Sequence, residues 1–183
     1  VYIDNFYPRR HLNTLAQDLA TDTLISVRTD KDAPFAAQVF KTVIDPFSGK
    51  LSYLKSFRGV LKSGSTVWNA NTEQEERIGQ IYLLKGKKME PVDQLEAGDI
   101  GAVNKLVNTN TGDTLCDEKQ KIKYYDIPLP KPVITMKISA AKSGEEDKVF
   151  AGLKRLQEED ISFKIEKNHD TGEMLLEGVG ETH

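Results

Sequence analysis

Apolar and polar residues alternate along much of the chain with the period of two that is typical of β-strands. In the segment KLSYLKSFRGVLK, residues 50–62, the odd-numbered positions from Leu51 to Phe57 fall on one side, and the even-numbered positions from Ser52 to Arg58 fall on the other. Gly59 follows directly and predicts a bulge or bend. The pattern therefore predicts one long strand that is interrupted at Gly59.

Further short runs rich in valine, isoleucine, threonine and aromatic residues flank this strand. They cover residues 35–45, 66–71, 76–84, 99–108 and 113–117, with turns such as DPFSGK and SGS, and the loop KGKKMEP, between them. Turns recur about every 10 residues and no long helix interrupts the strands, which favours a closed barrel or a sandwich. We expect a β-barrel over residues 33–118.

The first 32 residues carry a weaker pattern. Leu12, Leu15 and Leu19 have helical spacing and predict a short helix. The string TLISVRT, residues 23–29, predicts a strand instead. The clear β pattern begins only at Ala33, so this segment is expected to precede the barrel.

A proline-rich stretch separates the barrel from the rest of the chain. It reads EKQKIKYYDIPLPKP, residues 118–132, and its prolines enforce extended backbone and remove amide donors. We expect a linker over residues 119–131 and a second domain over residues 132–183.

The second domain shows the order strand, helix, strand, strand. VITMKIS alternates, and Ser143 followed by Glu146 predicts a capping box at the start of a helix that ends at Asp160. The helix carries an apolar stripe made of Val149, Phe150, Leu153 and Leu156. ISFKIEK and MLLEGVG then form strands on either side of the turn NHDTGE.

This order is the first part of a ferredoxin-like βαββαβ fold whose last helix and strand are absent. In that fold the first strand lies between the third and the fourth, so its outer edge is unpaired here. Because a bare edge is a template for another chain, we expect this domain to be partly disordered or to pair with a neighbour in a crystal.

Two Gly-Asp pairs, Gly98-Asp99 and Gly112-Asp113, bracket an apolar run of the barrel. A catalytic carboxylate pair would need both aspartate side chains within about 5–9 Å of each other. Glycine at a strand entry and aspartate bonded to nearby backbone amides are instead typical of turns. The regular segment between the pairs favours two turns.

Composition is that of an ordinary soluble globular protein, with 38% hydrophobic and 29% charged residues among 183. No run approaches the roughly 18 apolar residues of a membrane helix, and VYIDNFYPRR lacks the order of a signal peptide. The chain has no initiator methionine and stops at GVGETH, so we interpret it as a fragment. The single cysteine, Cys116, favours a reducing cytoplasm and has no cationic neighbour that would activate it.

Charge is unevenly distributed along the chain. The formal net charge of −3 argues against the whole chain as an electrostatic nucleic-acid binder. Residues 41–62 nevertheless hold five basic residues and one acid, whereas residues 145–160 hold six acids and three basic residues. Such runs are typical of solvated faces, and the basic run is also compatible with phosphate contact.

Motifs for catalysis and metal binding are absent from the sequence. His11, His169 and His183 are isolated, and zinc-type spacing does not occur. There is no phosphate-binding G-x-x-x-x-G-K-[ST] and no G-x-S-x-G elbow, and GVGETH lacks the third glycine of a dinucleotide fingerprint. These residues alone favour a two-domain binding or transmission module over an enzyme.

Several longer stretches of the sequence can be compared with the ordered motifs of known families. DPFSGKLSYLKSFRGVLKSGSTVWN is followed by EERIGQIYLLKGKK, LEAGDIGAV, TGDTLCD, PLPKPVI and LKRLQEEDISFKIEKNHDTGEMLLEGVGETH. In content and order these strings resemble motifs of the elongation factor G family over roughly residues 33–183. The resemblance implies domains II and III of that family: a translation-factor β-barrel, then an incomplete ferredoxin-like βαββ domain, hence a mainly β plus α+β fold.

The departures from the family pattern carry information of their own. LLKGKK replaces the usual Met-His-x-Asn near the barrel loop, EDISF replaces E-D-P-x-F, and GETH replaces G-E-L-H. We interpret the chain as part of an elongation-factor-G-like paralogue rather than of the principal translocase.

The resemblance also implies a mechanism and partners. GTP and magnesium would bind a missing upstream GTPase domain, whose tail and connector would be residues 1–32, and this chain would hold no cofactor or metal and be inactive alone. The barrel would pack on that domain and contact ribosomal RNA and proteins in the cytoplasm, without a membrane, and the third domain would relay the nucleotide state during translocation. The predicted ribosome contacts are Lys55, Arg58, Lys62, Lys85, Lys87 and Lys88.

Other functions remain open at this point. Within the same superfamily the resemblance also allows a tetracycline-resistance ribosomal protection protein or a release-factor GTPase. A stand-alone β-barrel binding module, or an enzyme with a cleft between its domains, belongs to a different class. A phosphate-binding loop and an N-K-x-D motif upstream of Val1 would distinguish the first class from the second.

Overall fold

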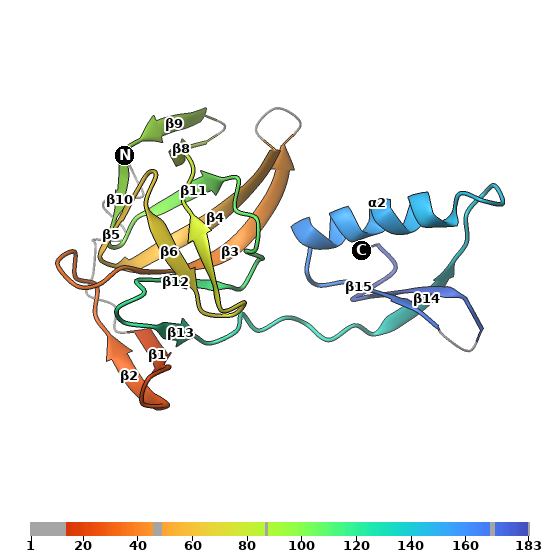
Figure 1. Ribbon diagram of the computed structural model, residues 1–183. Helices are drawn as coiled ribbons and strands as arrows, with labels where there is room; N and C mark the ends of the chain where they lie inside the picture. Colours follow the sequence, from red (N-terminus) through yellow and green to blue (C-terminus); the bar gives the residue numbers. More distant parts are fainter. Residues whose placement is uncertain (1–13, 46–48, 87, 169–170, 183) are drawn as a thin grey trace. The chain divides into compact units, whose positions relative to one another are not determined.

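Antiparallel strand pairing organises the chain into two compact units, Val1–Asp126 and Ile127–His183 (Figure 1). The computed structural model describes residues 14–45, 49–86, 88–168 and 171–182. Among these residues the α-helical part is α2 (Glu146–Glu159), which belongs to the second unit. The predicted fold class, mainly β plus α+β, is confirmed.

An eight-stranded antiparallel sheet forms the barrel-like body of the first unit, in the order β7-β6-β12-β3-β4-β11-β8-β9. Its strands are β3 (Ala36–Asp45), β4 (Gly49–Arg58), β6 (Thr66–Asn69), β7 (Gln74–Arg77), β8 (Ile81–Lys85), β9 (Lys88–Val92), β11 (Ile100–Asn104) and β12 (Thr114–Cys116). A separate two-stranded sheet pairs β5 (Val60–Lys62) with β10 (Gln94–Glu96). β9 lies where the sequence predicted a loop, because pairing with β8 orders that segment.

One face of the large sheet buries the main hydrophobic core. Val39 on β3, Leu54 on β4 and Val103 on β11 are each 0% exposed. The core cluster consists of Phe35, Ala37, Val39, Leu54, Leu61, Val67, Ile78, Ile81, Leu95, Val103, Leu106 and Leu115. The predicted alternation is confirmed in the middle of β4, since Leu54 faces this core while Tyr53 and Lys55 lie on the opposite, outer face. It is wrong at Arg58, because the β3–β4 register shifts between Ser56 and Arg58.

A three-stranded sheet in the order β13-β1-β2 joins the start of the described chain to the end of the first unit. Its strands are β1 (Thr14–Asp18), β2 (Thr23–Val27) and β13 (Ile122–Tyr124). It packs through a second core cluster of Ala16, Val27, Ala36, Ala70, Cys116, Ile122 and Tyr124. The β-strand predicted from TLISVRT is confirmed.

This sheet corrects two predictions. The helix predicted from Leu12, Leu15 and Leu19 is wrong for its described part, because β1 pairs on both sides and buries Ala16, while Leu15 is 53% exposed; Leu12 lies outside the described residues. The linker predicted over residues 119–131 is wrong in its first part. Ile122 is 0% exposed and belongs to β13, so the division between the units falls at residue 126.

A buried carboxylate holds the loop between β11 and β12. Glu76 on β7 is 3% exposed. Its carboxylate accepts hydrogen bonds from the backbone N–H groups of Val107 and Asn108 and from the hydroxyl of Thr109. Asn69 Nδ2 donates to that same hydroxyl at 3.2 Å. Because these donors replace water around the charge, Glu76 is tolerated inside and fixes the loop backbone.

Gly59 marks the bend between β4 and β5, as the sequence predicted. Its φ is +69°, and its N–H donates to Asp30 O at 2.7 Å. A Cβ at this position would lie 2.5 Å from Phe35 Cα. Glycine is therefore required both for the backbone conformation and for the close approach of the segment around Phe35.

The second unit is a three-stranded antiparallel sheet and one helix, in the chain order β14 (Ile134–Ile138), α2, β15 (Lys164–Lys167) and β16 (Met174–Gly178). The sheet order is β14-β16-β15, which confirms the predicted β-α-β-β arrangement. Among the described strands β14 pairs only with β16. The expectation that this edge is disordered or pairs with a neighbour stays a prediction.

The start of α2 differs from its prediction. The helix begins at Glu146 with Glu145 as N-cap, and no side-chain capping bond is made. The capping box of Ser143 is wrong because Gly144, with φ +90°, turns the backbone out of the helical conformation before the helix starts. Asp160 is the C-cap, as predicted.

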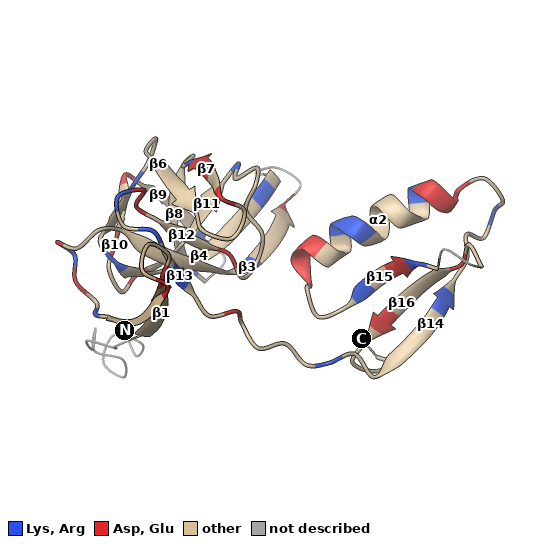
Figure 2. Cartoon of the chain, turned by 60° about the horizontal axis from the view of Figure 1, so that its bottom comes forward, with Lys and Arg blue, Asp and Glu red and all other residues tan. Residues whose placement is uncertain are grey.

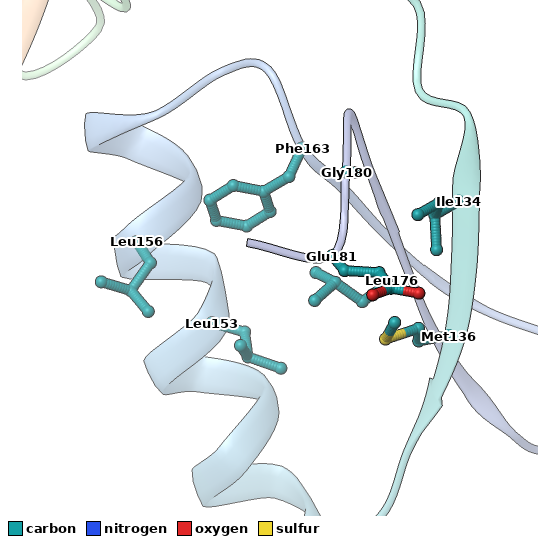
Figure 3. A pocket seen from close by; sticks show the side chains of 9 residues that line it. Ile134, Met136, Leu153, Leu156, Phe163, Leu176, Gly180 and Glu181 are labelled. Atoms are coloured by element: carbon teal, nitrogen blue, oxygen red, sulfur yellow. The ribbon is translucent and has the colours of Figure 1, made fainter. Parts of the chain in front are cut away.

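An open apolar cavity of about 180 Å³ lies between α2 and the sheet of the second unit (Figure 3). Figure 3 shows Leu153 of α2 pointing towards Met136 and Leu176 of the sheet, with Phe163 at one end. Leu156 also lines the cavity. Leu156 remains 54% exposed. Leu153 and Leu156 of the predicted apolar stripe therefore line this cavity, but no residue of α2 is buried.

Gly59→Ala is expected to lower the free energy of unfolding by about 3 kcal/mol or more, because left-handed backbone strain and overpacking add together. Gly64→Ala is the matched control. Gly64 also has positive φ, but a Cβ there meets nothing within 4 Å, so the loss should be about 1 kcal/mol. Urea unfolding followed by Trp68 fluorescence measures both, and equal losses would contradict the close-approach argument.

Candidate nucleic-acid interface

Lys55 lies on the outer face of the eight-stranded sheet, on the side of β4 that points away from the main core. Its register partners are Gln38 on β3 and Ile100 on β11. Its Nζ atom lies 5.8 Å from the centroid of the Phe57 ring, within range of a cation–π attraction. The lysine is half-buried, so its stem packs along the sheet. Its contact with RNA stays a prediction.

Arg58 is the last residue of β4 and is only 7% exposed. It pairs in register with Ala36 and sits beside the second core cluster, where its charge counteracts the rise that burial causes in the pKa values of Cys116 and Tyr124. Its Nε and Nη2 atoms are buried and make no hydrogen bond. A buried guanidinium does not present itself to a phosphate, so Arg58 is removed from the predicted contact surface.

The remaining predicted lysines lie elsewhere on the first unit. Lys62 is exposed on β5, opposite Gln94. Lys85 and Lys88 are register partners at the end of the β8–β9 hairpin, and Lys85 Nζ lies 2.7 Å from a carboxylate oxygen of Glu90. Lys87 lies outside the described residues. The structure thus brings Lys85 and Lys88 together but does not gather the five described residues of the predicted set on one face.

A cross-strand row of side chains runs over the outer face of the sheet. Across β3, β4, β11, β8 and β9, the successive register partners are Lys41, Tyr53, Ala102, Tyr82 and Pro91. Residues directly opposite one another on paired strands share a face. Ala102 is 0% exposed, with a tyrosine on either neighbouring strand. The two tyrosines therefore flank one small residue on the outer face.

A β-bulge adds a third aromatic ring to this face. The β3–β4 register shifts between Val39 and Lys41, so Phe40 is an extra residue without a partner on β4. Its ring lies 6.4 Å from that of Tyr53 in an edge-on arrangement, and Phe40 is 40% exposed. We call Phe40, Tyr53 and Tyr82 the aromatic platform, and Lys41 and Lys55 its flanking lysines.

The charge around the aromatic platform is positive. The row of Lys41 and the neighbouring row of Gln38, Lys55 and Ile100 contain two lysines and no acidic residue. Elsewhere the charges are mixed, as Figure 2 shows for α2, where acidic residues at both ends enclose basic residues. The outer face of the sheet is therefore locally basic on a chain whose formal net charge is −3.

Sequence reasoning identified Lys55 but missed Lys41, Phe40 and Tyr82 as its companions. The alternation along residues 50–62 did place Tyr53 and Lys55 on one side. The bulge at Phe40 and the distant pairing of β11 with β8 leave no periodic signal, because they depend on contacts between separate strands. Lys41 was visible as part of the basic run of residues 41–62.

The two Gly-Asp pairs are turns, as the sequence predicted. Gly98 and Gly112 have φ values of +93° and +99°. Asp99 Oδ2 accepts a hydrogen bond from the Glu96 N–H at 3.1 Å, and Asp113 Oδ2 accepts one from the Asn110 N–H at 2.8 Å. Each carboxylate is thus bonded to backbone within its own turn.

Within the described residues, no group of three or more histidine, cysteine, aspartate or glutamate side chains is arranged to hold a metal ion. His11, His169 and His183 lie outside those residues. In the same part of the chain, no helix combines the length and apolar character needed to cross a membrane.

Comparison with known proteins defines the class of the two units. The first unit matches the family model "Elongation factor G domain 2" over residues 34–118, and the second matches "Elongation Factor G, domain III" over residues 129–183. The class is thus that of translation-factor domains, a barrel followed by a small α+β domain. Together the two matches cover well over half of the chain and stand in the order of the family.

The chain belongs to the elongation factor G family and is a translation-factor-like protein carrying domains II and III. It is also similar to a crystal structure of ttk003000868 from Thermus thermophilus, with 33% sequence identity and a TM-score of 0.70. That similarity covers 82% of this chain and 23% of the other. The chain therefore spans about a quarter of the length of this relative.

Cys116 is expected to resist thiol reagents in the folded protein. It is 0% exposed, and burial raises the pKa of its thiol, so the reactive thiolate is scarcer at a given pH than in a free cysteine. Labelling with a chromogenic disulfide should be slow in buffer and complete in guanidinium chloride. Rapid stoichiometric labelling of the native chain would contradict the packing of the second core cluster.

Proposed function

We propose that this chain is the part of a ribosome-binding translational GTPase that couples nucleotide hydrolysis elsewhere in the same protein to movement on the ribosome. The observation that carries the proposal is the presence of two elongation factor G domains, II and III, in family order on one chain. In this role the barrel is a docking element and the second unit is a relay.

The physical basis of the coupling is a difference in contacts. Nucleotide state changes the surface that a GTPase domain offers to its neighbours, and this difference biases the arrangement of the attached domains. A docking element that binds ribosomal RNA converts that bias into force on the ribosome. The locally basic outer face of the barrel supports such a contact, because phosphate attraction is largely independent of sequence.

A specialised role within the family is the second candidate. The strings LLKGKK, EDISF and GETH depart from the family pattern, which favours a paralogue that protects or recycles ribosomes over the principal translocase. Complementation of a translocase-depleted strain by the full-length protein separates these roles. We place the protein in the cytoplasm on the basis of this proposed function.

Ribosome pelleting of the full-length protein is expected to fall steeply with salt concentration, because binding releases counterions from RNA. Charge reversal at two predicted contacts, the half-buried Lys55 and the exposed Lys62, by Lys55→Glu and Lys62→Glu should weaken pelleting. Each substitution should also reduce the slope of log affinity against log salt by about 1 for every phosphate that the lysine no longer neutralises.

Lys142→Glu is the control for this experiment, since Lys142 is exposed on a loop of the second unit and is not a predicted contact. It should pellet like the unmodified protein. Unchanged pelleting of the Lys55 and Lys62 variants would remove those residues from the interface, and absence of pelleting by the unmodified protein would overturn the proposed function.

Isothermal titration of the 183-residue chain with GTP and magnesium is expected to give no binding heat, because we place the nucleotide site in another domain of the protein. The full-length protein, titrated in parallel, should bind GTP. Micromolar affinity of the chain itself would contradict this division of roles.

A further inference from the structure

Resting on the proposed function, we propose that the aromatic platform stacks unpaired bases of RNA while its flanking lysines contact the adjoining phosphates. The site is the outer face of β3, β4, β11 and β8. The ribosomal partner of this face would thus be single-stranded RNA. Base stacking, as well as charge attraction, would contribute to the affinity of the barrel for it.

The geometry of the platform fits flat ligands. Tyr53 and Tyr82 stand on strands separated only by β11, hence about 10 Å apart, and the small residue Ala102 lies between them. Open sheet faces of this kind, with aromatic side chains on neighbouring strands, stack two or three bases in RNA-binding domains.

The bulge at Phe40 extends the platform sideways. An aromatic ring left 40% exposed loses hydrophobic stabilisation, and the bulge also interrupts the pairing of the longest hairpin in the described chain. Bulges are frequent next to functional sites, where they re-aim side chains. Here the bulge puts Phe40 beside Tyr53 and places Lys41 at the rim.

The positive charge of this outer face favours RNA over a protein as the molecule that binds there. Lysine is depleted at protein–protein interfaces, whereas positively charged grooves lined with aromatic rings are typical of single-stranded nucleic-acid sites. The two rows that form the face hold Lys41 and Lys55 and no acidic residue. The face therefore complements a polyanion with exposed π faces.

Fluorescence anisotropy of the 183-residue chain with a fluorescein-labelled RNA of about ten nucleotides, the size of one single-strand site, tests the proposal. Phe40→Leu and Tyr53→Leu keep apolar bulk but remove the π face, and each should weaken binding by roughly tenfold. Tyr53→Phe retains the ring and should bind like the unmodified chain. Lys41→Ala should reduce the salt slope by about 0.7, the value for one phosphate on a single strand.

Tyr125→Leu is the matched control. Tyr125 is another tyrosine of the first unit, 59% exposed, but it follows β13 and lies outside the two rows. It should leave affinity unchanged. A duplex of the same length should bind more weakly than the single strand and should not respond to Tyr53→Leu, because its bases are already stacked on each other.

Equal affinity of the Phe40→Leu, Tyr53→Leu and Tyr125→Leu chains would overturn the platform, as would a duplex that binds as well as the single strand. If Tyr53→Leu fails to fold by circular dichroism, Phe40→Leu and Lys41→Ala, both at exposed positions, decide the outcome. Ribosome pelleting of the full-length Phe40→Leu protein separates the two proposals. Normal pelleting with no single-strand binding refutes the platform alone, whereas a full-length protein that never pellets refutes the proposed function.

Discussion

The register between β3 and β4 is the constraint on which the rest of the first unit depends. These two strands form the longest pairing in the described chain and lie at the centre of the eight-stranded sheet. Their register decides that Leu54 enters the core and that Tyr53 and Lys55 face outward. A slip of one residue would exchange these two sets, bury a lysine and expose the core. The bend at Gly59 ends β4 and therefore also ends its pairing with β3.

The small sheet around the second core cluster joins the beginning of the first unit to its end. β1 and β13 are far apart in the chain yet are hydrogen-bonded neighbours, with Ala16 opposite Tyr124. Gln38 on β3 adds a side-chain bond of 2.8 Å to the carbonyl of Tyr125. The segment that precedes the barrel and the segment that leads to the second unit are therefore anchored on one small sheet. The relay role that we propose needs such firm attachment points, because a slack connection transmits no bias.

Prediction from the sequence succeeded for strands and bends that depend on residues close together in the chain. Period-two alternation located most strands of the barrel, and the glycines at positions 59, 98 and 112 marked bends that the structure confirms. It failed where a distant partner decides. Leu12, Leu15 and Leu19 have helical spacing, but the segment of Leu15 forms β1 because it pairs with β13 and β2. Arg58 looked like a surface cation in a basic run, but a register shift places it opposite Ala36, against the second core cluster, where it is 7% exposed. Charge counted along a chain does not distinguish the two faces of a strand.

The sequence by itself determined the family, the order of the two units and the alternation that assigns each strand an inner and an outer face, because these properties are carried by residue types at fixed short spacings. Only the tertiary structure decided which residues share a surface. Tyr82 and Tyr53 share a face on either side of Ala102 because β4, β11 and β8, which come from different parts of the chain, pair in this register. Phe40 joins them because a bulge inserts one unpaired residue. Backbone hydrogen bonding between distant segments, rather than any local preference, therefore builds the face to which we assign RNA binding.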